Sequence, residues 1–235
     1  MIEGSNVFDQ KVLVCCVYGI VDYSAQELKI PPLYPVVYRD IAAVVGTSCK
    51  ERLKFDRQAA IEYGHTLEVL HRDFTLIPCR FGTFLQNEHT VSRVLREHYC
   101  VYKKKLEEVK DRHEFGLKIM SEKKAQRSNV SNERRWESGK EYLMQKFYDY
   151  RTHIEAGQDA KKATDVIHGE LQRLSNMSLK DTKVNGNVVF SCNYLVEKRR
   201  KSLFCSKVQA LQGMYPELRF LLTGPWPPYN FVAGN

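Results

Sequence analysis

The sequence predicts an α+β protein made of two small α/β domains, residues 1–111 and 112–235. Segments that alternate in polarity, as β-strands do, are interspersed with segments whose apolar residues recur every three or four positions, as in helices. The length of 235 residues allows two modest domains. The charge also differs between the halves, because residues 1–111 contain 15 basic and 15 acidic side chains, whereas residues 112–235 contain 21 and 13.

In the N-terminal half, the first expected elements are a strand, a hairpin and a helix. The strand covers Lys11–Val21, and the hairpin pairs Val36–Tyr38 with Ile41–Val45. The helix is expected to end at Asp73, and Gly64 within it suggests that another element approaches closely. Its apolar face recurs at spacings of three and four: Ala60, Tyr63, Leu67, Leu70 and Phe74.

The stretch Thr75–Phe84 is short, apolar and rich in residues that favour strands, so we expect a buried strand between two helices. Pro78 has no N–H to donate, which predicts that the strand is at a sheet edge, is bulged there or begins late. Arg80 is a cation among apolar neighbours and must find a carboxylate or carbonyls, or point outwards. We interpret it as a structural anchor. Arg80, Phe81 and Gly82 are therefore candidates for a structural or interaction motif, with Gly82 marking a close backbone approach or a bulge.

A second helix is expected after this strand, with Asn87 as its N-cap. The residues of its apolar stripe are Val91, Val94, Leu95, His98, Tyr102, Leu106 and Val109. The expected elements of this half thus come in the order β-β-β-α-β-α. With the helices on one face of a small mixed sheet, this arrangement is close to a ferredoxin-like fold.

The C-terminal half is expected to begin with a strand, Glu114–Met120, and to contain a long helical pattern from Trp136 to Leu174. If Gly157 does not interrupt the pattern, about 40 residues form one rod of roughly 60 Å. If Gly157 does interrupt it, the result is a helical hairpin. Both forms predict a coiled-coil element, because the alanines on the stripe allow close helix packing.

Three further elements are expected before the C-terminus. They are a strand over Val188–Val196, a helix that opens with the basic cluster Lys198–Lys201, and a last strand over Leu218–Leu222. The charges of the basic cluster oppose the helix dipole, so a contact with phosphates is one interpretation and a solvated turn is the simpler one.

The C-terminal segment is the most unusual in composition. Three prolines around a tryptophan preclude a regular helix and favour an extended chain. Its aromatic side chains are expected to dock on the chain itself or, alternatively, on a partner. The candidate motif residues of this segment are Gly224, Pro225, Trp226, Pro227, Pro228 and Tyr229.

Motifs of common enzymes are absent, since the sequence contains no G-x-S-x-G, no phosphate-binding P-loop and no H-E-x-x-H. An enzyme that uses Arg80 with Cys79 or His71 is disfavoured, because an apolar environment makes a thiol unreactive. The seven cysteines include no C-x-x-C pair, which argues against a disulfide framework and a zinc site. We therefore expect no enzyme, no catalytic residue, no cofactor and no metal site.

The sequence also gives an expectation for location. Its start lacks the features of a signal peptide, and the longest apolar run, Val12–Val21, is too short to span a bilayer. A cytoplasmic protein without a membrane partner is expected.

Several stretches of the chain resemble the gas vesicle protein family GvpF/GvpL. The most specific is Leu222–Val232, with the sequence LTGPWPPYNFV. Four others agree in order and spacing, so that the resemblance covers nearly the whole chain: Tyr18–Val21, Ile77–Thr83, Glu114–Ile119 and Asn193–Val196. Cys79 stands where a larger apolar residue is expected, which leaves the choice between the GvpF and GvpL subgroups open.

The resemblance implies a non-enzymatic accessory or minor structural protein of gas vesicle assembly. It implies binding to the hydrophobic shell protein GvpA and to other accessory Gvp proteins during vesicle nucleation, and a location at the gas vesicle. It also implies a ferredoxin-like N-terminal domain and a C-terminal domain with a coiled-coil element.

From the charges, we expect the neutral N-terminal domain to bind GvpA, at a sheet edge or in an apolar groove, and the basic C-terminal half to recruit other accessory proteins. The alternative function is a nucleic-acid-binding module, because a ferredoxin-like sheet with a basic surface can bind RNA. The sequence lacks the run of basic, glycine and aromatic residues that RNA-binding sheets of this kind use, so nucleic acid is not the expected partner.

Overall fold

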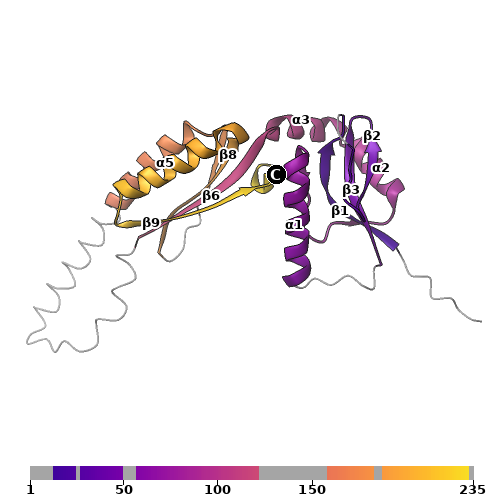
Figure 1. The fold of residues 1–235 in the computed structure, drawn as a ribbon, viewed down its shortest axis with the longest axis horizontal. Helices are drawn as coiled ribbons and strands as arrows, with labels where there is room; N and C mark the ends of the chain where they lie inside the picture. Colours follow the sequence, from indigo (N-terminus) through magenta and orange to yellow (C-terminus); the bar gives the residue numbers. More distant parts are fainter. Residues whose placement is uncertain (1–12, 25–26, 50–56, 122–157, 183–186, 233–235) are drawn as a thin grey trace, which may run out of the picture. The chain divides into compact units, whose positions relative to one another are not determined.

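The computed structural model describes residues 13–24, 27–49, 57–121, 158–182 and 187–232. The chain divides into two compact units (Figure 1). Unit 1 comprises Met1–Asp111 together with Pro227–Asn235, and unit 2 comprises Arg112–Trp226. The chain therefore crosses between the units twice. Residues 227–235, which the sequence assigns to the C-terminal domain, group with unit 1 instead.

Unit 1 is built on an antiparallel sheet with the strand order β2-β3-β1-β4, and β5 also pairs with β1. The strands are β1 (Leu13–Asp22), β2 (Tyr34–Tyr38), β3 (Ile41–Cys49), β4 (Leu76–Pro78) and β5 (Phe84–Leu85). The expected first strand and hairpin are confirmed, since Tyr38 pairs with Ile41 on either side of the turn.

The described helices of unit 1 are α1 (Arg57–Asp73), α2 (Glu88–Glu97), α3 (Tyr99–Val109) and the one-turn α6 (Tyr229–Val232). Helix α1 buries Tyr63, Leu67 and Leu70 as its periodicity predicts, whereas Ala60 of the same predicted face is exposed. The core that it forms with the sheet consists of Val21, Ala42, Val44, Tyr63, Leu67, Leu70, Phe74 and Leu76.

The expected continuous strand over Thr75–Phe84 is wrong. This stretch forms two short strands, β4 and β5, separated by a turn at Arg80–Thr83. Strand β4 lies at the edge of the sheet, as Pro78 predicts. The strand cannot continue because Gly82 has a φ angle of 87°, which turns the chain out of the extended conformation.

The expected second helix is also interrupted. It forms α2 and α3, which are separated at His98, whose φ and ψ angles are −108° and 15°. Asn87 caps α2 as predicted, because its side-chain oxygen accepts a hydrogen bond of 2.9 Å from the backbone N–H of Thr90. Neither proline nor glycine marks the interruption, so the residue pattern gives no signal for it.

Unit 2 contains a second antiparallel sheet with the strand order β7-β8-β6-β9. The strands are β6 (Arg112–Ser121), β7 (Met177–Lys180), β8 (Val188–Glu197) and β9 (Leu218–Trp226). The described helices are residues 158–172 and α5 (Lys201–Met214). Helix α5 follows a 3₁₀ turn over Lys198–Arg200, so the basic cluster begins as a turn and not as an α-helix.

The described elements of unit 2 come in the order β-α-β-β-α-β, which is the order of ferredoxin-like folds. Unit 1 instead has three strands before its first described helix. The ferredoxin-like arrangement expected of the N-terminal domain stays a prediction. The strand order of its sheet, β2-β3-β1-β4, corresponds to the order β7-β8-β6-β9 of unit 2.

The core of unit 2 lies between its sheet and two helices that cover the same face (Figure 1). Alternate residues of β8 face this core as their period predicts: Phe190, Cys192, Tyr194 and Val196. Ile167 and Leu171 contribute from the helix over 158–172, and Phe204 and Val208 from α5. Gly157 and the pattern before it lie outside the described residues, so the choice between a rod and a hairpin stays a prediction.

Candidate interaction site

The Arg80-Phe81-Gly82 motif is a tight turn. The backbone N–H of Thr83 donates to the carbonyl oxygen of Arg80 at 3.1 Å, and the Thr83 hydroxyl donates to the same oxygen at 2.8 Å. Gly82 occupies the third position of the turn, where a type II turn requires positive φ. The backbone of the motif is therefore fixed, while Phe81 has 39% of its surface exposed.

Tyr63 of α1 holds this turn in place. Its hydroxyl donates to the carbonyl oxygen of Cys79 at 3.0 Å and lies 3.4 Å from that of Arg80. Its ring stacks on Tyr18 at 4.9 Å and lies 5.3 Å from the ring of Phe81. Burial raises the pKa of Tyr63, with smaller contributions from neighbouring groups that include Cys79 and Tyr229. The hydroxyl therefore stays protonated and able to donate.

Arg80 points outwards, which is one of the outcomes that the sequence left open. Its side chain is exposed and forms no ion pair with a described residue. The anchoring role belongs to the Arg80 carbonyl group, which receives the hydrogen bonds of Thr83, and not to the guanidinium. The guanidinium is therefore available to a partner.

The last strand is longer than expected, because β9 continues past Leu222 to Trp226 and pairs there with Glu114. Gly224 has a φ angle of 112°, and a Cβ atom at this position would lie 2.7 Å from the carbonyl oxygen of Glu114. Only glycine fits this conformation and contact. Gly224, Pro225 and Trp226 thus belong to the sheet of unit 2.

Beyond Trp226 the chain belongs to unit 1 and forms α6, which packs on α3 and β4. The expectation that the prolines preclude a helix is wrong here, because Pro227 and Pro228 precede α6, where no N–H is needed. Both prolines and Val232 are buried, and Lys105 Nζ donates to the Val232 carbonyl oxygen at 2.6 Å. The tail docks through these groups, whereas Tyr229 keeps 38% of its surface exposed.

The outer strands β2 and β4 of the unit 1 sheet are poor sites for an added strand. The outer strands in the order β2-β3-β1-β4 are β2, which contains Pro35, and β4, which contains Pro78. Proline has no N–H to donate to a neighbouring strand, and natural sheets use it to protect their edges. Of the two contact modes that the sequence suggested for this half, the apolar surface is better supported than the sheet edge.

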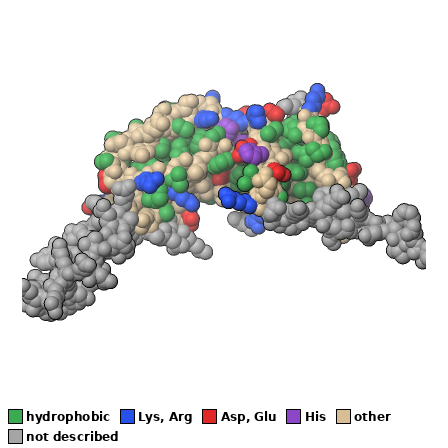
Figure 2. Space-filling model, turned by 60° about the horizontal axis from the view of Figure 1, so that its bottom comes forward, with side chains coloured by type: hydrophobic (Ala, Val, Ile, Leu, Met, Phe, Trp, Pro, Cys, Tyr) green, Lys and Arg blue, Asp and Glu red, His purple; other side chains and the backbone are tan. Residues whose placement is uncertain are grey.

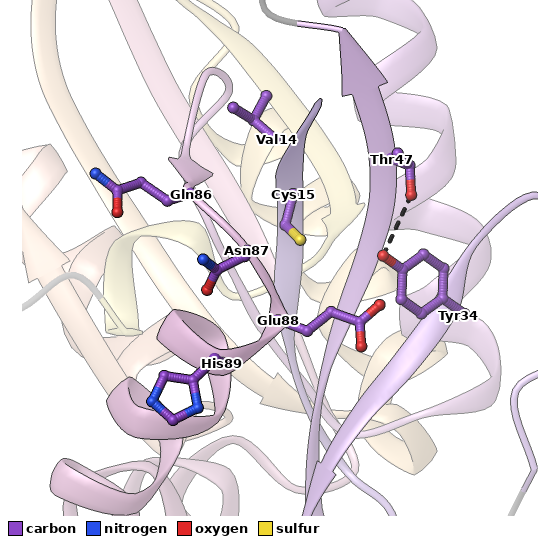
Figure 3. A pocket seen from close by; sticks show the side chains of 8 residues that line it. All are labelled: Val14, Cys15, Tyr34, Thr47, Gln86, Asn87, Glu88 and His89. Carbon is purple, nitrogen blue, oxygen red and sulfur yellow. Dashed lines mark hydrogen bonds between the residues drawn. The ribbon is translucent and has the colours of Figure 1, made fainter. Parts of the chain in front are cut away.

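Unit 1 also contains a pocket of about 370 Å³. Figure 3 shows it between three strands and the start of α2. The lining residues are Val14, Cys15, Tyr34, Thr47, Gln86, Asn87, Glu88 and His89. They come from four separate segments of the chain, and for that reason no motif in the sequence indicates the pocket.

One wall of this pocket is formed by Tyr34, Thr47 and Glu88, and Gln86, Asn87 and His89 lie on the other side (Figure 3). The hydroxyls of Tyr34 and Thr47 are hydrogen-bonded at 3.2 Å, and the Glu88 side chain extends towards Tyr34 (Figure 3). The hydrogen bond with Thr47 lowers the pKa of Tyr34, but burial and the neighbouring Cys15 and Glu88 outweigh it, so the net shift is upward. With an apolar floor at Val14 and Cys15, the pocket fits an apolar side chain that ends in a polar group.

The described residues offer little for catalysis. Among them, no three His, Cys, Asp or Glu side chains gather where they could hold a metal ion. Burial raises the pKa of Cys16 to about 11 and that of Cys79 to about 12, so both thiols stay protonated at neutral pH. No helix in the described part of the chain is long and apolar enough to cross a membrane.

The positive charge of the basic cluster Lys198–Lys201 is partly neutralised by Glu197, the last residue of β8. Arg199 Nε lies 2.6 Å and Arg200 Nε 3.5 Å from Glu197 Oε2. A carboxylate shared by two guanidinium groups reduces the attraction of this cluster for phosphates. The solvated turn therefore explains the cluster better than a phosphate contact does.

The chain is thus an α+β protein of two units, with a fixed, exposed turn and a docked proline-rich tail in unit 1. The family model "Gas vesicle synthesis protein GvpL/GvpF" matches residues 14–233, and the chain belongs to this family. Among its relatives, gas vesicle protein F1 of Halobacterium salinarum is 23% identical over 227 residues, which are 92% of this chain and 91% of the relative. Gas vesicle protein L of a Streptomyces species is 28% identical over 167 residues, 67% of this chain and 62% of the relative.

Two solved structures have the same fold. The crystal structure of GvpF from Anabaena sp. PCC7120 matches with a TM-score of 0.75 at 18% identity, over 94% of this chain and 99% of that one. The structure of GvpF from Microcystis aeruginosa matches with a TM-score of 0.70 at 17% identity, again over 94% and 99%. The chain therefore has a role in gas vesicle formation through its family, and its fold is that of GvpF.

The structure separates the candidate residues of the C-terminal motif. Pro227, Pro228 and Tyr229 are in unit 1 together with Arg80–Gly82, whereas Gly224–Trp226 are in unit 2. Sequence reasoning missed Tyr63 as the residue that organises the first group. Its position on the buried face of α1 looked like ordinary core packing, and nothing in the sequence indicates where its hydroxyl points.

Proposed function

We propose that this protein is a non-enzymatic accessory protein of gas vesicle assembly, which is cytoplasmic, associates with the gas vesicle and binds GvpA and other accessory Gvp proteins. Family membership supports the general role. The two units are proposed to act as separate domains, with unit 1 binding GvpA.

One observation supports the assignment to unit 1. The exposed rings of Phe81 and Tyr229 belong to segments that are both fixed in unit 1, the first by the Tyr63 hydrogen bonds and the second by the docking of α6 on α3 and β4. Rigid, partly exposed aromatic side chains bind partners at a small entropic cost. The zero net charge of residues 1–111 avoids a repulsive field towards an apolar partner.

The test is capture of purified GvpA by the full-length protein, because residues 1–111 alone lack α6. Phe81→Ala combined with Tyr229→Ala is expected to weaken capture at least about tenfold, since aromatic anchors dominate interfaces of this kind. The matched control is Ile61→Ala with Val101→Ala, which removes exposed apolar side chains from other helices of unit 1. Equal losses in both double variants, or no loss in the first, would contradict the proposal.

A further inference from the structure

Unit 2 has a surface that this proposal does not use, namely the face of its sheet opposite the two helices. We call it the open face. In the register of the sheet, Gly116 stands between Asn193 and Thr223, and Lys118 stands opposite Leu221. These residues alternate with Phe115 and Leu117, which point into the core, so they lie on the other side of the sheet.

The exposed apolar side chains of the open face stand on its two outer strands, with Leu179 of β7 at 42% and Leu221 of β9 at 47% exposure. In the middle, the short side chains of Asn193 and Thr223 flank Gly116, where a Cβ would lie 3.2 and 2.8 Å from their oxygens. Three strand spacings separate β7 from β9, or about 14 Å, which is wide enough for an α-helix of about 10 Å.

The two most exposed charged side chains within the strands of the open face are basic. Lys118 and Arg219 are exposed, and neither forms an ion pair with a described residue. Two carboxylates stand at outward positions of the strands: Glu114 is buried at 3% exposure, and Glu197 lies at one end of β8, where it pairs with Arg199 and Arg200. A third carboxylate, Asp181, directly follows the outer strand β7, and its backbone N–H donates to the Ser191 carbonyl oxygen. In Figure 2, basic and hydrophobic side chains lie next to one another on the described surface of unit 2.

We propose that the open face binds an amphipathic helix with acidic flanks from a partner protein. The inference rests on the proposed function, because it names the surface through which unit 2 recruits a second assembly protein. Apolar side chains of the helix would lie between Leu179 and Leu221, and its carboxylates would meet Lys118 and Arg219.

Two other occupants fit less well. RNA-binding sheets stack two or three bases on exposed aromatic side chains, whereas among the described outward positions the exposed aromatic residue is Trp226 alone, at the end of the outer strand β9. A second copy of unit 2, packed face to face about a two-fold axis, would place Lys118 and Arg219 near their own counterparts. Like charges would oppose that contact.

The test uses full-length protein and a fluorescein-labelled 14-residue helical peptide with leucines at helical spacing and glutamates at its other positions. Lys118→Glu with Arg219→Glu is expected to weaken peptide binding at least about tenfold at low salt, because two attractive contacts become repulsive. The control is Lys161→Glu with Lys162→Glu, exposed residues of the helix over 158–172 that give the same change in net charge. Its effect is expected to stay below about threefold.

Several outcomes would overturn this inference. One is equal binding of a peptide in which lysines replace the glutamates, and another is an equal loss in both double variants, which would show an effect of net charge alone. Tight binding of a single-stranded RNA that is lost in Lys118→Glu with Arg219→Glu would assign the face to nucleic acid. Because GvpA capture is tested at Phe81 and Tyr229 of unit 1, a failure of either proposal is distinguishable from a failure of the other.

Discussion

The hydroxyl of Tyr63 lies 3.0 Å from the carbonyl oxygen of Cys79, and this contact joins α1 to the segment that leads into the Arg80-Phe81-Gly82 turn. The same ring lies against Phe81, so one side chain fixes both the backbone and the exposed ring of the motif. The motif therefore holds the Phe81 ring in a fixed position and is not a flexible loop.

Tyr63→Phe is expected to lower the free energy of unfolding by about 1–2 kcal/mol, because it removes the hydrogen bond to Cys79 and leaves a partly buried carbonyl group without that donor. The stacked ring is kept, so the loss comes from the hydroxyl alone. Urea unfolding measures it. Tyr38→Phe is the control, because the Tyr38 hydroxyl forms no hydrogen bond with a described residue, and a similar loss there would refute this role of Tyr63.

Gly19→Ala is expected to destabilise the protein by about 2 kcal/mol or more, whereas Gly64→Ala is expected to stabilise it by up to about 1 kcal/mol. A Cβ at Gly19 would lie 2.6 Å from the carbonyl oxygen of Ile77, and a Cβ at Gly64 would meet nothing within 4 Å. Thermal unfolding of both variants checks the signs. An unchanged unfolding temperature of Gly19→Ala would contradict this prediction, because it would mean that β1 and β4 move apart at little cost in free energy.

These two glycines show what the sequence can and cannot predict. Periodicity located α1 and its buried face, because apolar spacing is a local property of the chain. It assigned the close approach to Gly64, whereas the approach is at Gly19, because the neighbour of a glycine depends on which strand pairs beside it. The pocket at Tyr34 escaped prediction for the same reason, since its lining comes from segments distant in sequence. No residue signal marks the break at His98. By contrast, the composition of the tail predicted docking, and α6 packs on α3 and β4, although Trp226 and Tyr229 stay partly exposed.

The stability of unit 2 is expected to fall as the pH drops from about 6.5 to about 4 because of His113. Burial, then Lys198 and Lys201, lowers the pKa of His113 from 6.5 to about 4 in the folded protein. Over this range the unfolded chain binds a proton that the folded one does not, so stability present above pH 6.5 is lost towards pH 4. After allowance for partial exposure, the loss is on the order of 1–2 kcal/mol.

His113→Gln is expected to flatten the curve of unfolding free energy against pH in that window, measured by urea unfolding at half-unit steps. Lys198→Gln with Lys201→Gln is expected to flatten it in part, because removal of the two cations raises the pKa of His113. An unchanged slope in His113→Gln would assign the acid sensitivity to other groups.

Ending the chain at Trp226 is expected to loosen unit 1 and to leave unit 2 intact. The truncation removes Pro227, Pro228 and α6, which cover apolar surface on α3 and β4. Hydrogen exchange is expected to rise in β4 and α3 and to stay unchanged in β8. Lys105→Met, which removes only the hydrogen bond to Val232, is expected to give a smaller rise of the same pattern. Faster exchange mainly in β8 would contradict the assignment of the tail to unit 1.

The most direct measurement is gas vesicle formation in a vesicle-forming host whose own gene for this protein is deleted and replaced by a variant. Electron microscopy is expected to show vesicles with the wild-type gene and with Ile61→Ala plus Val101→Ala. Few or none are expected with Phe81→Ala plus Tyr229→Ala, provided that immunoblots show equal protein levels. Normal vesicles with that double variant, or in the deletion strain without any replacement, would contradict the account.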